Sequence, residues 1–392
     1  MAASGDPSAR RRRRLGALSA LAAAAAGLGV AVGSVGGGSD DGEKRGRERA
    51  EASQAPKPKK GVDRLSVERQ VGELLLMSFD ETEPPDYIRR RLKNGEGAGV
   101  IIFTKNTPDP DSAAELTQEL QRAAGGDALV AADQEGGTIR SVPLAEPESA
   151  QPSLATAEEA GESASAGAED LKAAGVNINL APVADVSADS ASVIEGRAYP
   201  GDAETVAPLV EASVSAYNDA GVASTAKHFP GLGLATENTD DVSVAITATA
   251  DDLRELELPS FQAAVDADVP LVMASHALYP GLDQNRIASQ PPQVIEELLR
   301  GELGFEGVVV TDSLEAQAVL DRSKPGEAAV RSVEAGVDLV LMTGSSSWND
   351  VYPALLNKAK SDPEFRARVR ESAGRVLALK KRLGLKGQTP SS

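Results

Sequence analysis

The sequence between residues 63 and 386 consists of short apolar runs that alternate with longer amphipathic segments. Apolar runs of this length, bounded by turn residues, are typical of buried strands. The triplet Ala-Gly-Val recurs at 174–176, 220–222 and 335–337, where an amphipathic segment ends and an apolar run begins. Because glycine is favoured just after a helix, each triplet indicates a helix end, a turn and the next strand. Eight strands are therefore predicted, at 74–79, 98–103, 128–132, 176–180, 222–226, 269–274, 307–311 and 337–342.

The amphipathic segments carry apolar residues at helical spacing, as Leu253, Leu256, Phe261 and Val265 do. Helices are predicted at 110–124, 156–174, 203–220, 250–267, 292–303, 325–335 and 363–385. Strands alternating with helices in this number predict a (β/α)8 TIM-type barrel, an α/β fold, as a single catalytic domain over 63–386. An open doubly wound sheet is the alternative. A phosphate-binding GxGxxG after the first strand would favour it, and the sequence has none there.

The N-terminus has the pattern of a targeting segment. Arginines at positions 10–14 precede a stretch without charge that ends at Asp40. We interpret residues 1–35 as an export signal or an N-terminal membrane anchor. Residues 36–62 are rich in glycine, serine, charge and proline, which predicts a disordered linker. Residues 387–392 form a short tail. The protein is expected to be exported, and to be extracellular or anchored on the outer face of a membrane.

The composition excludes several classes of function. Acidic residues number 59 against 40 basic residues, which argues against binding a phosphate backbone. Cysteine is absent, so disulfides, thiolate catalysis and cysteine zinc sites are excluded. With two histidines and no HExxH or DxDxDG spacing, we expect no metal and no other cofactor. We also expect a monomer.

Polar residues follow the predicted strands at the end where barrel enzymes place their chemistry. Both histidines fall there, which packing alone would not require. The residues are Asp133, Gln134 and Glu135 after the third run, Pro182 and Asp185 after the fourth, Lys227 and His228 after the fifth, His276 after the sixth, Asp312 after the seventh and Thr343 after the eighth.

Two of these positions, and an arginine on a loop, suggest chemistry, each with a simpler alternative. Asp312 could be a nucleophile or a cation partner, or the N-cap of a helix starting at Leu314. Asp133, before a double glycine, could accept hydrogen bonds from two sugar hydroxyls, or be a turn residue. Arg197 lies on a long loop, where it could hold a substrate hydroxyl or carbonyl, or be a surface arginine.

Together, these motifs resemble the family 3 glycoside hydrolases, in their single-domain β-N-acetylhexosaminidase branch. The resemblance covers about residues 65–385 and follows the family's order. It implies a retaining mechanism with Asp312 as nucleophile. It also implies that Asp133, Arg197, Lys227 and His228 hold the sugar, and that His276 lines the same pocket. The matching stretches are 99–103, 133–137 with Arg140, 181–185, 196–197, 227–231, 273–276 and 311–313.

The resemblance fails at the general acid/base. Relatives usually read Lys-His-Phe-Pro-Gly-His-Gly, followed by an Asp-Ser-His triplet whose histidine transfers the proton. Here Leu232 replaces the histidine that follows Pro-Gly, and the triplet is Asn238-Thr239-Asp240. Asp240 is then the candidate acid/base, with Asp241 and Glu237 as further candidates. A free aspartate has a pKa of about 3.9, so burial or a like charge would have to raise it.

The resemblance therefore implies a retaining exo-glycosidase that removes terminal β-linked N-acetylhexosamine from peptidoglycan or chitin fragments. Its expected partner is a carbohydrate substrate, with no nucleic acid. Two alternatives stay open. One is a β-glucosidase of the same family. The other is a slow or inactive relative that binds sugar because the loop at 232–241 no longer transfers a proton.

Overall fold

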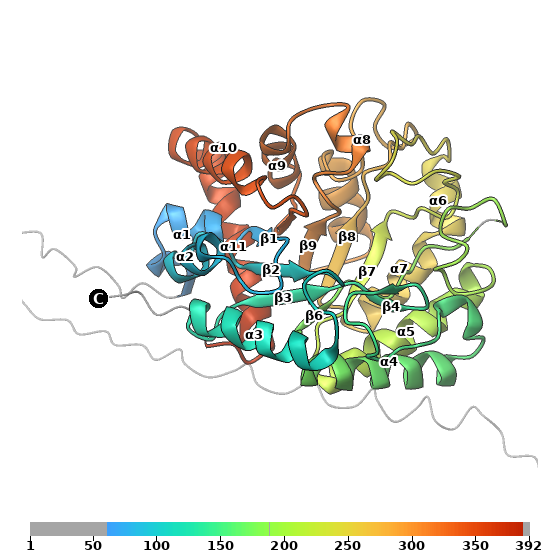
Figure 1. Ribbon diagram of the computed structural model, residues 1–392. Coiled ribbons are helices and arrows are strands. Elements are labelled where there is room, and N and C mark those ends of the chain that lie inside the picture. The colour runs from blue at the N-terminus through green and yellow to red at the C-terminus, as the bar shows by residue number, and fades with distance from the viewer. Residues whose placement is uncertain (1–60, 188, 387–392) are drawn as a thin grey trace, which may run out of the picture. The chain divides into compact units, whose positions relative to one another are not determined.

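A computed structural model describes residues 61–187 and 189–386 (Figure 1). The predicted export segment, nearly all of the predicted linker and the tail at 387–392 lie outside the described residues. The described chain begins with a short 3-10 turn, η2 (Gly61–Arg64), and helix α1 (Val67–Gly72). Strands and helices then alternate up to helix α11 (Pro363–Arg382).

Eight parallel strands form a closed barrel. Strands β10, β1, β2, β3 and β6 make one parallel sheet, and β7, β8 and β9 make another. Parallel bridges from Ile178 to Ala223 and from Val310 to Leu339 join the two sheets at both seams. The predicted (β/α)8 barrel is thus confirmed. Its strands are β1 (Leu75–Met77), β2 (Gly99–Ile102), β3 (Leu129–Ala132), β6 (Ile178–Asn179), β7 (Thr225–Phe229), β8 (Leu271–Ala274), β9 (Val308–Thr311) and β10 (Val340–Leu341).

Helices surround the barrel, as Figure 1 shows. They are α2 (Asp86–Asn94), α3 (Pro110–Ala124), α4 (Ala157–Ala173), α5 (Ala203–Ala220), α6 (Ala250–Leu256), α7 (Leu258–Asp266), the π-helix η4 (Gln293–Glu302), α8 (Gln317–Leu320), α9 (Pro325–Glu334) and α10 (Trp348–Ser361). The single helix predicted at 250–267 is wrong. The chain breaks at Glu257, whose φ of −121° is not helical. Pro259 follows in the first turn of α7, where it cannot continue the hydrogen bonds of α6.

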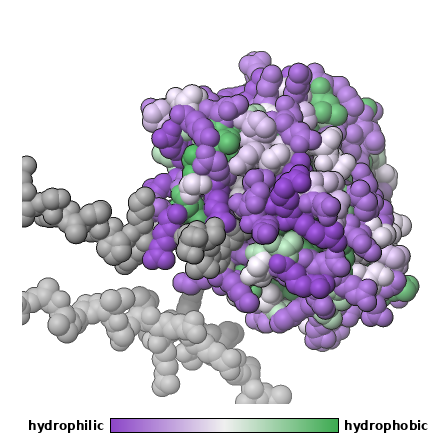
Figure 2. Space-filling view, turned by 60° about the vertical axis from the view of Figure 1, so that its left-hand side comes forward, coloured by the Kyte–Doolittle hydropathy of each residue, from purple (hydrophilic) through white to green (hydrophobic). Residues whose placement is uncertain are grey.

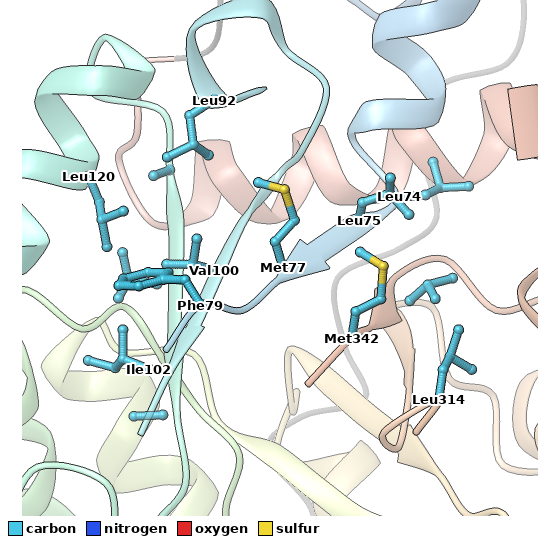
Figure 3. Close-up of a cluster of buried hydrophobic side chains, with 14 of the residues drawn as sticks. Leu74, Leu75, Met77, Phe79, Leu92, Val100, Ile102, Leu120, Leu314 and Met342 are labelled. Carbon is cyan, nitrogen blue, oxygen red and sulfur yellow. The ribbon is translucent and has the colours of Figure 1, made fainter. Parts of the chain in front are cut away.

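The core lies on both sides of the strands, because successive strand residues point in opposite directions. Inside the barrel, Leu76, Ile101 and Met273 pack together, and α11 covers this cluster with Val376 and Leu379. The alternate residues face the helices. Figure 3 shows part of that outer layer, where strand residues such as Leu75 and Val100 meet helix residues such as Leu92 and Leu120.

The outer surface is mainly hydrophilic on the face drawn in Figure 2, with small separate apolar patches. The large apolar side chains exposed among the described residues are Leu144, Leu256 and Leu320, which lie apart in the sequence. Within residues 61–386, none of the described helices combines the length and apolar character that crossing a membrane would need.

Candidate active site

A cavity of about 670 Å³ lies at the carboxyl ends of the strands. Its walls bring together residues that are far apart in the sequence and that come from separate strand ends, as the barrel fold requires. Six of the seven predicted site residues line it, namely Asp133, Arg197, Lys227, His228, Asp240 and Asp312. His276 does not.

Strand β7 carries Lys227 and His228 itself. We expected both residues just after a strand ending at 226, but the strand runs from Thr225 to Phe229. The Lys227 ammonium is buried and lies 2.6 Å from Asp133 Oδ1 and 2.6 Å from Glu135 Oε1. Burial alone would lower the pKa of Lys227, but these two carboxylates more than offset it and raise the pKa. Lys227 is therefore a fixed cation at the floor of the cavity.

Glu135 links Lys227 to Arg197. Its carboxylate accepts hydrogen bonds from Arg197 Nε at 2.9 Å and Nη2 at 2.7 Å. Burial would raise the pKa of Glu135, but Lys227 and Arg197 outweigh it and hold the pKa at about 2. The Arg197 pKa is raised, because Glu135 and neighbouring carboxylates outweigh its burial. The sequence placed Glu135 at this end of the barrel, but no role was expected for it. Its place two residues after Asp133, beside the double glycine, was the available signal.

Asp185 orients the imidazole of His228. It is a second residue for which the sequence predicted no role. Its Oδ2 accepts from His228 Nδ1 at 2.7 Å, and its Oδ1 accepts from the main-chain N–H of His228 at 2.9 Å and of Leu232 at 2.7 Å. With Nδ1–H donated to a buried carboxylate, Nε2 is the ring atom left for the cavity. Asp185 thus holds both the histidine and the turn that starts the next loop.

Asp312 follows β9 directly, and its Oδ1 accepts from the main-chain N–H of Ser313 at 2.7 Å. The N-cap alternative is wrong, because α8 begins at Gln317 and its N-cap residue is Ala316. Burial would raise the pKa of Asp312, but His228, His276 and the Ser313 N–H outweigh it and lower the pKa. The group therefore stays a carboxylate, the form that a nucleophile needs.

His276 was expected to line the cavity, but it does not. It contacts the main chain of Asp312 from the buried side. It is fully buried. Its Nε2 lies 3.0 Å from the Asp312 carbonyl oxygen, and its Nδ1 lies 2.9 Å from Ser289 Oγ. A carbonyl only accepts, so Nε2 carries the proton. Burial lowers the pKa of His276 despite the charge of Asp312.

All three candidates for the acid/base are exposed to solvent, but of the three only Asp240 lines the cavity. Burial among the cavity walls raises the pKa of Asp240, and the charge of Asp312 raises it further, against His228 and Arg197. Water still reaches Asp240 in the open cavity. Its environment therefore disfavours the charge only in part until a ligand excludes that water.

Main-chain hydrogen bonds hold the Asp240 loop against the first residues of α8. The carbonyls of Thr239 and Asp240 accept from the N–H groups of Ala318 and Gln317, each at 3.1 Å. Asn238 Oδ1 accepts from the Asp240 N–H at 3.0 Å. Asn238 thus shapes the turn of the main chain, and the Asp240 loop and the start of α8 form one hydrogen-bonded unit.

The Glycosyl hydrolase family 3 N terminal domain matches residues 66–379. The chain belongs to glycoside hydrolase family 3. A beta-hexosaminidase of Stenotrophomonas maltophilia is 32% identical over 287 residues, covering 69% of this chain and 83% of that protein. An uncharacterized secreted glycosyl hydrolase of Arthroderma benhamiae is 32% identical over 335 residues, covering 80% and 93%. A family 3 beta-N-acetylglucosaminidase structure from Paenibacillus has 35% identity and a TM-score of 0.79, covering 84% of this chain and 64% of that one.

As a family 3 protein, the chain is a glycoside hydrolase of the β-glycosidase kind, with a carbohydrate substrate. Its cavity fits that class, because cations and carboxylates alternate around a space that also has apolar walls. Among residues 61–187 and 189–386, no group of three or more histidine or acidic side chains could hold a metal ion.

Proposed function

We propose that the protein is a retaining exo-glycosidase that removes terminal β-linked N-acetylhexosamine from peptidoglycan or chitin fragments. One observation carries the proposal. Asp312 and Asp240 line the same cavity, and their pKa values move in opposite directions, down for Asp312 and up for Asp240. Two carboxyl groups separated in this way match the division into nucleophile and proton donor that retaining glycosidases use.

In the first step, an Asp312 carboxylate oxygen attacks the anomeric carbon while the bond from that carbon to the leaving oxygen breaks. Asp240 gives its proton to the leaving oxygen, so that the aglycone departs as an alcohol and the sugar stays as an ester of Asp312. In the second step, Asp240, now a carboxylate, takes a proton from water as the water attacks the anomeric carbon. Asp312 is released, and the product keeps the β configuration.

The remaining polar wall would hold the sugar. Lys227 donates to Asp133 and Glu135, and Arg197 donates to Glu135, so these charges keep fixed positions before a substrate arrives. Asp133 keeps its Oδ2 for a sugar hydroxyl, and His228 presents Nε2. Groups that are already oriented lose little entropy on binding, which favours the distorted sugar of the transition state.

The choice of N-acetylhexosamine is supported by relatives. The Stenotrophomonas relative is a beta-hexosaminidase and the Paenibacillus structure is a beta-N-acetylglucosaminidase. The test compares three properties with aryl β-glycosides. Release from the N-acetyl-β-glucosaminide should be faster than from the β-glucoside, the first-formed product should be the β anomer by NMR, and a slow fluorinated substrate should label Asp312. Faster release of glucose would favour the β-glucosidase, and absence of both release and label would refute a glycosidase.

A slow or inactive sugar-binding protein is the second candidate. The observation in its favour is Asn238, whose side chain contacts the main chain and leaves Asp240 without an orienting carboxylate. This candidate predicts that N-acetylglucosamine binds measurably by calorimetry, that its affinity falls in Asp133→Asn, and that aryl glycosides show no turnover. Turnover at an ordinary enzymatic rate would exclude it.

We further propose that residues 1–35 direct export and that 36–62 link them to the catalytic domain at 63–386. Arginines 10–14 and the uncharged stretch after them support this, as does the secreted Arthroderma relative. Fractionation of cells that express the full chain, with N-terminal sequencing of the exported form, distinguishes cleavage from anchoring. Recovery only in the cytoplasmic fraction would refute export. Light scattering of the purified chain tests the expected monomer.

A further inference from the structure

Two hydroxyl-bearing residues of the cavity wall follow neighbouring strands, and one of them is next to the nucleophile in the sequence. Ser313 follows Asp312 at the end of β9, and Thr343 follows the end of β10. Both residues line the cavity. Their chain neighbours Leu314 and Met342 point the other way, into the outer core (Figure 3). Both hydroxyl-bearing residues therefore face the cavity, whereas the residues next to them belong to the core.

The protons of both hydroxyls are used within the protein. Thr343 Oγ1 donates to Glu315 Oε2 at 3.0 Å, and Ser313 Oγ lies 2.6 Å from Thr343 Oγ1 and 3.2 Å from Glu315 Oε2. Each hydroxyl proton has an acceptor inside this network, which is Glu315 Oε2 for Thr343 and either Glu315 Oε2 or Thr343 Oγ1 for Ser313. Two main-chain N–H groups complete the network: Thr343 N–H donates to Glu315 Oε2 at 2.7 Å, and Glu315 N–H donates to Ser313 Oγ at 3.2 Å. What remains for a ligand on both hydroxyls is lone pairs.

We propose that Ser313 and Thr343 form a subsite that only accepts hydrogen bonds, and that it binds the proton-bearing substituent on the sugar carbon next to the anomeric carbon. Asp312 must reach the anomeric carbon, so the groups beside Ser313 are that carbon's own neighbours. They are the ring oxygen, the glycosidic oxygen and the substituent at carbon 2. The two oxygens carry no proton in a glycoside and cannot donate. The substituent at carbon 2 can, through an acetamido N–H or a hydroxyl.

Glu315 is the positioning residue of this subsite. It does not line the cavity, and it acts through the hydroxyls that it holds. Its Oε2 also accepts the Thr343 N–H, so a glutamine here would place its carbonyl oxygen in that position and keep the network. A leucine would release both hydroxyl protons, which could then turn toward the cavity and donate. The subsite proposal rests on the proposed function, because it assumes a glycoside as the substrate. The test below distinguishes failure of the subsite from failure of that function.

The test uses three dinitrophenyl β-glycosides that differ only at carbon 2, with acetamido, hydroxyl or fluorine. Fluorine has no proton to donate and serves as the reference. We measure the second-order rate constant for dinitrophenolate release, which reports glycosylation. Thr343→Val keeps the shape but removes the acceptor, and the rate ratio of acetamido to fluoro should fall about tenfold, the effect of one hydrogen bond. Thr343→Ser keeps an acceptor and should keep the ratio.

Glu315→Gln should keep the wild-type ratio and Glu315→Leu should lower it severalfold, which a merely structural role of Glu315 would not produce. An unchanged ratio in both Thr343→Val and Ser313→Ala, or equal ratios in the two Glu315 variants, would overturn the subsite. If wild type prefers the hydroxyl substrate and the ratio of hydroxyl to fluoro still falls in Thr343→Val, the subsite stands and the N-acetylhexosaminidase proposal fails.

Discussion

Replacing Glu135 by glutamine should destabilise the protein strongly, because two cations depend on this carboxylate. Glu135 contacts Lys227 and Arg197 at 2.6–2.9 Å, and only 3% of its side chain is exposed. The cations hold its pKa at about 2, against an ordinary value of 4.5. At about 1.4 kcal/mol for each unit, this shift corresponds to about 3 kcal/mol. Removing one partner of a buried pair costs about 3–5 kcal/mol in other proteins. We expect a loss of about 3 kcal/mol at pH 7.

The sign of the pH dependence follows from the lowered pKa. A carboxyl group whose pKa is lower in the folded state stabilises fully above its unfolded pKa and loses this effect as the pH falls through the folded value. The difference in the free energy of unfolding between wild type and Glu135→Gln should therefore be constant above about pH 5.5 and shrink from about pH 4.5 toward pH 2. Urea denaturation, followed by circular dichroism across this range, gives both the loss of stability at pH 7 and its dependence on pH.

The exposed pair of Arg254 and Glu302 is a matched control. It has the same two-point geometry, at 2.7 and 2.8 Å, but both side chains are more than 40% exposed. Glu302→Gln should leave the urea midpoint unchanged within error, since exposed pairs contribute little. If Glu135→Gln is no more destabilising than Glu302→Gln, or if its effect does not depend on pH, the cation network does not hold the cavity floor as we infer.

Three further outcomes are expected. Asp240→Asn should lose turnover of aryl glycosides with poor leaving groups but keep turnover of dinitrophenyl glycosides. The wild-type rate should fall as the pH rises through the raised Asp240 pKa, and this fall should be absent in the variant. Asp312→Asn should abolish both turnover and labelling by a fluorinated substrate while the thermal midpoint stays near that of wild type, as mass spectrometry and calorimetry will show. Lys380→Met should lower the free energy of unfolding by about 3–5 kcal/mol, because it leaves Glu73 and Asp127 buried without their cation, and urea denaturation measures this.

The barrel was predictable because its strands are buried on both faces. Such strands are continuous apolar runs, and each of the eight predicted runs overlaps an observed strand. The fifth was misplaced by about three residues, since Lys227 and His228 looked too polar for a strand. They are accommodated there because Asp133, Glu135 and Asp185 pair with them. Tertiary partners of this kind are not visible in a local pattern.

The same reason explains which site residues were found. Asp312 follows β9 directly, and Lys227 and His228 directly follow the apolar run at 222–226, so their position in the sequence indicated the cavity. Glu135 and Asp185 also follow apolar runs, but their roles depend on contacts across the barrel. Glu135 binds Arg197, and Asp185 binds His228. His276 shows the opposite error, because a strand end places a residue at the rim without fixing the direction of its side chain. There it points to Ser289 and to the main chain of Asp312.

The changes at the first and third positions of the family's acid/base triplet are consistent with each other. A histidine acid needs a neighbouring carboxylate to orient its ring and favour its charged form, whereas an aspartate acid needs surroundings that disfavour its charge. Here Asp312 already supplies a negative charge that raises the Asp240 pKa. A carboxylate at position 238 would add a further negative charge to the loop, beside Asp240 and Asp241. Asn238 adds no charge and uses its oxygen to fix the Asp240 N–H, while the main chain of α8 fixes the two carbonyls. The loop therefore orients Asp240 through its backbone, which a short aspartate side chain allows.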